Sequence, residues 1–211
     1  MKFLLRGSLV LLFGVAVTLS SAYAQTNLDV FFGVGTATDS HAAPTTVPGF
    51  VGTFTGPKLD GTFGKIGADV LLSHGLGFGG EADFRFSQAG YFPDLGLNYR
   101  PIFWDFNGIF APGNGRIEPD LEAGIGGADI KYYVSQSSCL FGSVCSNVNQ
   151  YIQSSNHFQL HFSAGVRFYV TPHIFLRPQV DAHWVHNFVD FGSDWAPEYS
   201  VSVGWSFAAH Q

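Results

Sequence analysis

The sequence has few charged residues: Asp, Glu, Lys and Arg together make up 12% of its 211 residues, against roughly 25% in a typical soluble domain. It has a single methionine, at position 1, and two cysteines, whereas hydrophobic residues reach 46% and aromatic residues 16%. This composition excludes a disordered chain and argues against an ordinary cytosolic globule. No Pro-rich or Ser-rich linker divides the chain, so we expect one domain of about 200 residues.

The sequence also lacks the ~20 consecutive apolar residues that a membrane-spanning helix requires. An apolar stretch at 9–19 follows Lys2 and Arg6, and the small residues of Ala22-Tyr23-Ala24 come after it. A positive start, a short apolar run and a small-residue cleavage site are the three regions of a secretory signal peptide. We therefore predict export, with residues 1–24 as the signal peptide.

Positive charge is scarce in the part that would remain. Loss of Lys2 and Arg6 leaves 8 basic residues against 16 acidic ones, a net charge of −8 with histidine neutral. Such an acidic chain repels phosphate groups, so we expect no nucleic-acid partner.

The two cysteines, Cys139 and Cys145, lie in the polar stretch 135–155. A close pair in an oxidising compartment predicts a disulfide that holds a loop together. A metal site would need further ligands nearby, and no His, Asp or Glu lies between Lys131 and Asn156.

Helical spacing of apolar residues is absent beyond residue 25, and a period of two takes its place. Apolar and polar or small residues alternate most clearly from Leu76 to Phe86. The fourth such segment changes phase near Arg100-Pro101, where we expect a β-bulge. Eight segments show the alternation, at 28–35, 66–73, 76–87, 98–110, 117–125, 158–169, 176–184 and 199–207.

The connections between these segments alternate in length. Short turns at 74–75, 111–116 and 171–173 contain Gly or Pro. The intervening connections are long, at about 37–64, 88–97, 135–155 and 187–198. This pattern is typical of bacterial outer-membrane barrels. We predict an all-β fold for residues 25–211, an eight-stranded antiparallel up-and-down transmembrane β-barrel that acts as a monomer.

Alternation alone leaves open which face points outward. A soluble lipocalin-like barrel would turn Phe32, Phe78 and Phe162 inward around an apolar ligand. The polar face is poor in lysine, with only Lys65 and Lys131 near strand ends, which favours the inverse arrangement with lipid outside. Aromatic residues also gather near the strand ends, as in a membrane-interface girdle: Tyr132, Tyr133, Tyr169, Trp184, Tyr199 and Trp205.

A barrel of about eight strands is narrow enough for side chains to fill it. Bulk diffusion of nutrients is therefore not the expected function, and we predict a lumen plugged by ion pairs, with no catalytic site, metal or cofactor. The predicted polar network comprises Glu81, Asp83, Arg85, Glu118, Asp120, Glu122, His161, Ser163, Arg167, Arg177, Asp181 and His183.

Four segments resemble the small outer-membrane β-barrel family of OmpA-barrel and OmpX type. They are Leu28–Gly35, the Gly-rich Leu76–Phe86, Pro119–Ala128 and the aromatic-ended Tyr199–Phe207. The resemblance implies an outer-membrane protein surrounded by lipid and lipopolysaccharide, whose last segment is read by the barrel-assembly machinery. It implies a structural or interactive function at the cell surface, where the Cys139–Cys145 loop and the first long loop (Thr38 to Gly64) are the expected contact surfaces.

A weaker similarity to lipid A deacylase barrels keeps an enzymatic alternative open. Those enzymes carry His-x-Ser on a late strand and Glu on the last, and here His183-Trp184-Val185 and Glu198 correspond to them. Val185 replaces the nucleophile and cannot attack an ester.

A second His-x-Ser, His161-Phe162-Ser163, lies one strand earlier in the sequence. A hairpin about Pro172 would set Ser163 opposite Asp181 and His161 opposite His183. These are residue types of a hydrolytic triad or a metal site, and also of a structural lumen network, which we favour.

Overall fold

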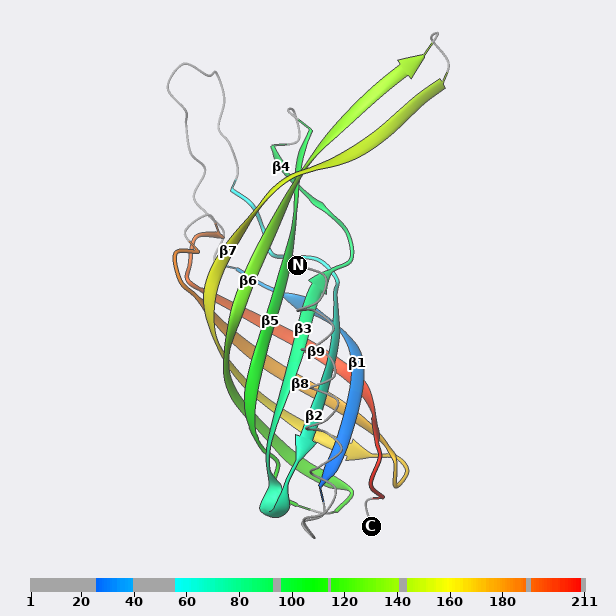
Figure 1. The fold of residues 1–211 in the computed structure, drawn as a ribbon, viewed down its shortest axis with the longest axis vertical. Helices are drawn as coiled ribbons and strands as arrows, with labels where there is room; N and C mark the ends of the chain where they lie inside the picture. The colour runs from blue at the N-terminus through cyan, green and yellow to red at the C-terminus, as the bar shows by residue number, and fades with distance from the viewer. Residues whose placement is uncertain are drawn as a thin grey trace, which may run out of the picture.

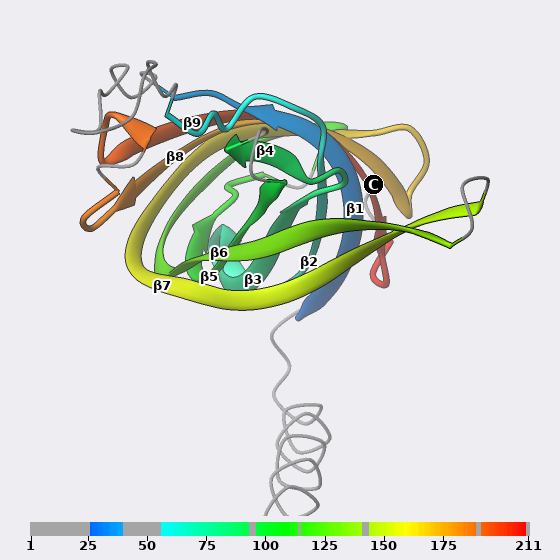
Figure 2. The same ribbon diagram turned by 90° about the horizontal axis from the view of Figure 1, so that it is seen from above.

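The computed structural model describes residues 26–39, 56–92, 96–113, 115–140, 144–188 and 191–209. It is a closed antiparallel β-barrel of eight strands (Figures 1 and 2). The barrel strands are β1 (Asn27–Ala37), β2 (Phe63–Leu71), β3 (Leu76–Arg85), β5 (Leu97–Phe110), β6 (Ile117–Leu140), β7 (Val144–Tyr169), β8 (Ile174–Val185) and β9 (Trp195–Ser206). A short ninth strand, β4 (Ala89–Phe92), continues along β5 beyond the end of β3. Within the described ranges no helix is long and apolar enough to cross a membrane.

Each barrel strand pairs with the strand before it and the strand after it in the sequence. The ring closes where β1 meets β9, from Asp29 opposite Ser206 to Ala37 opposite Glu198. All eight predicted strands are therefore present, and the predicted up-and-down topology is confirmed. The predicted signal peptide lies outside the described residues.

The two ends of the barrel differ, as the connection lengths predict. At one end β2 and β3 are joined by the 3-10 turn η2 (Ser73–Gly75), in which His74 and Gly75 have φ of 64° and 74°. A Cβ at Gly75 would lie 2.4 Å from the carbonyl oxygen of Ala111, so the close approach of the next turn requires glycine. In outer-membrane barrels the end with short turns faces the periplasm.

At the other end, β6 and β7 continue far beyond the remaining strands as a two-stranded hairpin (Figure 1). β5 accompanies β6 only as far as Val134, and pairing between β6 and β7 runs on to Leu140 opposite Val144. The expectation of a long loop over 135–155 is therefore wrong. The polar composition of this segment suggested a loop. A two-stranded β-ladder that has solvent on both faces also consists of polar residues, so composition does not distinguish the two. Cys139 and Cys145 lie opposite each other in this ladder, and their side chains fall outside the described part of the chain.

The bulge expected at Arg100-Pro101 is absent. β5 alternates between lumen and outside without interruption, and its register with β6 is unbroken from Leu97 to Phe110. The apparent phase change reflects a change in residue type and not in orientation. The inward positions are apolar or aromatic as far as Phe103, and they are polar at Asp105 and Asn107. Register shifts occur instead near Gly90 in β4 and at Tyr132/Tyr133 in β6.

The outer face of the barrel is apolar. The side chains of Phe32, Phe78 and Phe162 are 68%, 51% and 47% exposed and point away from the lumen. The soluble ligand-carrying alternative required these rings inside and is contradicted. Tyr199 and Trp205 also lie on the outer face, as a girdle requires. Tyr169 does not: it is buried in the lumen against Phe175, so its assignment to the girdle was wrong.

Inside the barrel, apolar layers lie on either side of a polar one. Toward the long-connection end, an outer aromatic layer is formed by Ala37, Leu59, Phe63, Tyr99, Phe103, Ala128, Ile130, Val185, Phe188, Phe191 and Ala196. Toward the short-turn end, an inner apolar layer is formed by Phe31, Tyr169, Phe175, Leu71, Ile109 and Ala111. Most of the buried charged groups lie between the two layers.

Candidate functional site: the ionic network of the lumen

Arg167 is the centre of the half of the network that adjoins the inner apolar layer. Its guanidinium donates to the carboxylates of Asp29, Asp69 and Asp120 at 2.5, 2.8 and 2.8 Å. These partners come from β1, β2 and β6, whereas Arg167 belongs to β7. A guanidinium offers five N–H donors in a fixed plane, so one arginine can join strands across the lumen.

Arg177 of β8 adds a second guanidinium to the same carboxylates. It donates to Glu122 at 2.8 Å, to Asp69 and Asp120 at 3.2 Å each, and to Glu81 at 3.3 Å. Both arginines are fully buried. Charges removed from water are tolerated only when oppositely charged groups and hydrogen bonds compensate the lost solvation, and this arrangement provides both.

Lys65 of β2 is the centre of the other half of the network. Its ammonium lies 2.9 Å from Glu81, 3.2 Å from Asp83 and 3.2 Å from Asp181. Glu81 therefore connects the two halves, since its other oxygen accepts from Arg177. Sequence reasoning placed Lys65 near a strand end, which is correct, but treated it as peripheral; it is 2% exposed and lies within the network.

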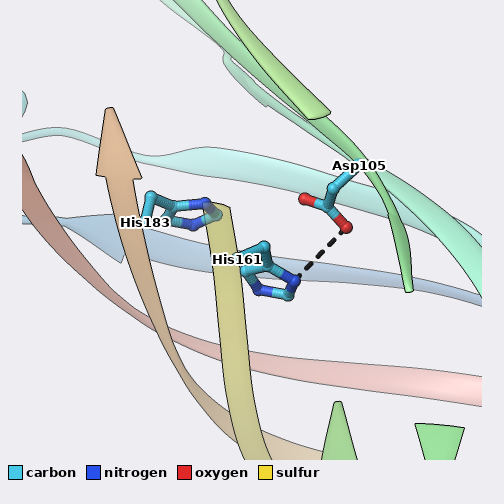
Figure 3. Close-up of side chains that lie close together, drawn as sticks. All are labelled: Asp105, His161 and His183. Carbon is cyan, nitrogen blue, oxygen red and sulfur yellow. Dashed lines mark ion pairs between the residues drawn. The ribbon is translucent and has the colours of Figure 1, made fainter. Parts of the chain in front are cut away.

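His161 donates from both ring nitrogens. Its Nδ1 lies 3.0 Å from the side-chain oxygen of Asn107 and 3.3 Å from Asp105, and its Nε2 lies 3.1 Å from Asp181. The pair with Asp105 is drawn in Figure 3. An imidazole that donates from both nitrogens is the positively charged form. His161 therefore adds one cation to the Lys65 half.

His183 lies beside His161 but is held differently. The two imidazole rings stack with centroids 4.9 Å apart (Figure 3). Phe103 of the outer aromatic layer stacks on His183, with ring centroids 4.7 Å apart. The register sets His161 opposite His183 and Ser163 opposite Asp181, as the sequence predicts. Neither ring nitrogen of His183 has a hydrogen-bond partner, and Glu198 is its nearest carboxylate, 3.8 Å from Nε2.

The structure encloses more negative than positive groups. Ten buried carboxylates accompany four buried permanent cations among the described residues. The cations are Lys65, Arg85, Arg167 and Arg177, and His161 adds one more charge. Both halves share this excess, and in the Lys65 half Asp83, Asp105, Asp181 and Glu198 accompany one lysine and two imidazoles.

All residues predicted for the polar network lie inside the barrel, but two stand apart from these contacts. Arg85 donates to the carbonyl oxygen of Lys58 and lies against Tyr99, at the outer aromatic layer. Ser163 is buried, with no hydrogen bond to Asp181 across the ladder. Glu118 is buried opposite Arg167 in the β6–β7 register.

Several network members were missed. Their positions alternate in phase with the predicted ones, so the period of two was sufficient to find most of them. Asp105 and Asn107 were missed because the bulge expected in β5 left their orientation undetermined. Lys65 was missed because a residue near a strand end was not expected to reach the network. The missed residues are Asp29, Lys65, Asp69, Asp105, Asn107, Gln159, Gln179 and Glu198.

No protein-family model and no curated protein matches the sequence. Solved structures do match the fold. A major outer membrane protein from Thermus thermophilus superposes with a TM-score of 0.56 at 12% identity, covering 86% of this chain and 99% of its own. Neisserial surface protein A gives 0.50 at 14% identity, covering 87% and 99%. Ail, the attachment invasion locus protein of Yersinia pestis, gives 0.50 at 13% identity, covering 86% and 99%. The fold is thus that of the small outer-membrane β-barrels, as the resemblance of the sequence implied.

Proposed function

We propose that this protein is a monomeric, non-enzymatic barrel of the outer membrane that forms no open channel and makes contacts at the cell surface through its β6–β7 hairpin. The observation that carries the proposal is the burial of ion-paired side chains inside a barrel of only eight strands. An aqueous pore needs a continuous open path, and buried ion pairs together with the apolar clusters inside the barrel support a closed lumen.

The outer wall supports the membrane location. Large apolar side chains from all eight barrel strands are exposed to the outside, among them Phe32, Phe106 and Ile125. A soluble monomer rarely exposes a contiguous apolar surface of this extent, whereas a barrel in a bilayer requires one.

The hairpin supports the surface role, because beyond Ser135 the described ladder joins only β6 and β7 and extends past the other barrel strands. The 135–155 segment contains no Lys or Arg and is rich in Ser, Asn and Gln. Hydroxyl and amide groups recognise a neutral, hydrogen-bonding partner. Ail is described with a heparin analogue, sucrose octasulfate, but the absence of cationic side chains here argues against a sulfated ligand.

Lipid A deacylation is disfavoured by where the candidate groups lie. His161, Asp181 and His183 are fully buried in the lumen, and Ser163 is 8% exposed on the same side of the wall. An ester in the surrounding lipid cannot reach a nucleophile inside the barrel, and catalysis requires the two within reacting distance. Val185, at the position of the deacylase serine, is also buried.

Three measurements test the proposal. Purified protein in a planar lipid bilayer should give no stepwise conductance, and an epitope placed at residues 141–143 should be labelled on intact cells. Overproduction should leave the acyl-chain composition of lipid A unchanged. Stable channels, an epitope hidden from antibody, or a deacylated product that disappears in the Ser163→Ala variant would each overturn the proposal.

A further inference from the structure

Three buried side chains near the outer aromatic layer bring metal-ligating atoms together. Asp83 of β3, His183 of β8 and Glu198 of β9 each offer one ligand atom, and these atoms lie within 4.8 Å of one another. All three side chains are fully buried. Asp83 and Glu198 are 115 residues apart in the sequence. Closure of the barrel therefore brings these three side chains together.

The ligand atoms of this group are left without hydrogen bonds. Both carboxylate oxygens of Asp83, both of Glu198 and both ring nitrogens of His183 lack a hydrogen-bond partner. Asp83 also forms an ion pair with Lys65, in which its Oδ1 lies 3.2 Å from the ammonium and its Oδ2 stays available. A buried polar atom that makes no hydrogen bond costs free energy, and a group of such atoms at one place favours a ligand that satisfies several of them together.

The local charge points to a cation. Glu81, Asp83 and Asp181 share the ammonium of Lys65, and Glu198 lies next to His183 in the same part of the lumen. His183 is fixed by ring stacking on Phe103 and His161 rather than by a hydrogen bond. Its orientation is therefore determined while the nitrogens at the ring edge stay free to bind.

We propose that Asp83, His183 and Glu198 form a binding site for a divalent first-row transition metal, such as zinc. One imidazole nitrogen and two carboxylate oxygens are a ligand set that zinc accepts, and the nitrogen disfavours magnesium or calcium. The 3.8 Å between His183 Nε2 and Glu198 Oε2 can be spanned by two bonds of about 2.0–2.2 Å to one ion. Bound there, the ion offsets the excess negative charge and ties β3, β8 and β9 together.

Two neighbouring sets of residues are weaker candidates. Asp105, His161 and His183 form one, and Glu81, Glu122 and His161 form the other. Both depend on His161, whose two nitrogens already donate to Asn107 and Asp181. A metal would have to displace these bonds, whereas neither ring nitrogen of His183 makes a hydrogen bond that a metal must break.

The test measures metal retained by the folded full chain. Wild-type protein is refolded in detergent micelles with a slight excess of zinc sulfate, freed of unbound metal by gel filtration, and analysed for zinc by mass spectrometry. His183→Phe preserves the stacking and removes both nitrogens, and Glu198→Gln preserves size and removes the charge. Glu118→Gln is the matched control, because it removes a buried carboxylate from the Arg167 half of the same lumen.

We expect close to one zinc per folded wild-type chain and per Glu118→Gln chain, and binding weakened about 10-fold or more by His183→Phe and by Glu198→Gln. Heat-modifiable mobility on gels identifies the folded fraction, and X-ray absorption of the wild-type complex should detect a single imidazole ligand. The proposal is overturned if folded wild-type protein retains no zinc. It is equally overturned if Glu118→Gln loses as much zinc as Glu198→Gln, or if two imidazoles bind the ion.

Discussion

The guanidinium of Arg177 lies over the ring of Phe31, with its central carbon 3.8 Å from the ring centroid. Arg177 also donates to carboxylates of β2, β3 and β6. One side chain therefore connects the inner apolar layer to the ionic network, and a desolvated cation gains energy from an aromatic face as well as from carboxylates.

Arg177→Met should destabilise the barrel strongly, because it leaves the carboxylates of Asp69 and Glu122 buried with less compensation. Removing one partner of a buried pair costs about 3–5 kcal/mol. Urea-induced unfolding in detergent or lipid, followed by gel mobility, measures the change. Arg116→Met, at an exposed turn, is the control and should change the midpoint little. Equal stability of the two variants would contradict a stabilising function for the network.

Gly204→Ala should also destabilise the fold. Gly204 lies opposite both Phe31 and Phe175, and a Cβ at this position would be 2.0 Å from the Phe175 ring. Overpacking of this kind typically costs about 1–3 kcal/mol. Gly115→Ala is the control, since no atom lies within 4 Å of its added carbon. The same unfolding assay should separate the two; a harmless Gly204→Ala would mean that the ring can move aside.

Phe106→Arg tests the membrane-facing wall. Phe106 is 69% exposed at the middle of the β3–β5 ladder, and an arginine near the bilayer midplane costs about 2–4 kcal/mol in such barrels. Folding efficiency into lipid vesicles should fall for this variant. Gln150→Arg, in the protruding hairpin, should fold like wild type, and similar losses in both would argue that the wall does not meet lipid.

The cysteine pair gives a prediction that needs no structural assay. Directly opposite residues of an antiparallel ladder have Cα atoms about 4.5–5.5 Å apart, which suits a disulfide. Protein taken from the outer membrane should therefore contain no thiol that can be alkylated without reductant. Cys139→Ser should expose Cys145 to alkylation and leave barrel unfolding unchanged, because the bond lies in the hairpin. A freely alkylated wild-type protein would exclude the disulfide.

The period of two was sufficient to predict all eight strands and which residues share a face. The scarcity of lysine then indicated which face points inward, and the turn about Pro172 gave the register of His161 with His183. Side chains alternate across a strand whatever its neighbours are, so this information is local to the sequence. The alternation of short and long connections then determined the topology, since an up-and-down meander is the simplest way to pair such strands in order.

Other features depended on contacts that a single strand does not encode. Tyr99 and Phe103 face the lumen, where Phe63, Phe188 and Phe191 pack in the same cluster. Because these two inward residues are apolar, the alternation of β5 looked as if its inward and outward faces had exchanged. Tyr169 is inward for the same kind of reason, through its contact with Phe175. The length of the β6–β7 hairpin was missed because its sequence is polar and lacks the apolar alternation that marks the barrel strands.

Asp29 and Arg167 are 138 residues apart in the sequence, and they meet only once β1 has joined β9 and the ring is complete. Before that moment the sheet presents acidic groups whose counterions are still distant. Joining of the last seam and formation of the Asp29–Arg167 ion pair are therefore the same event. Insertion should accordingly be all-or-none, with partly formed sheets short-lived rather than stable resting points on the way to the finished protein.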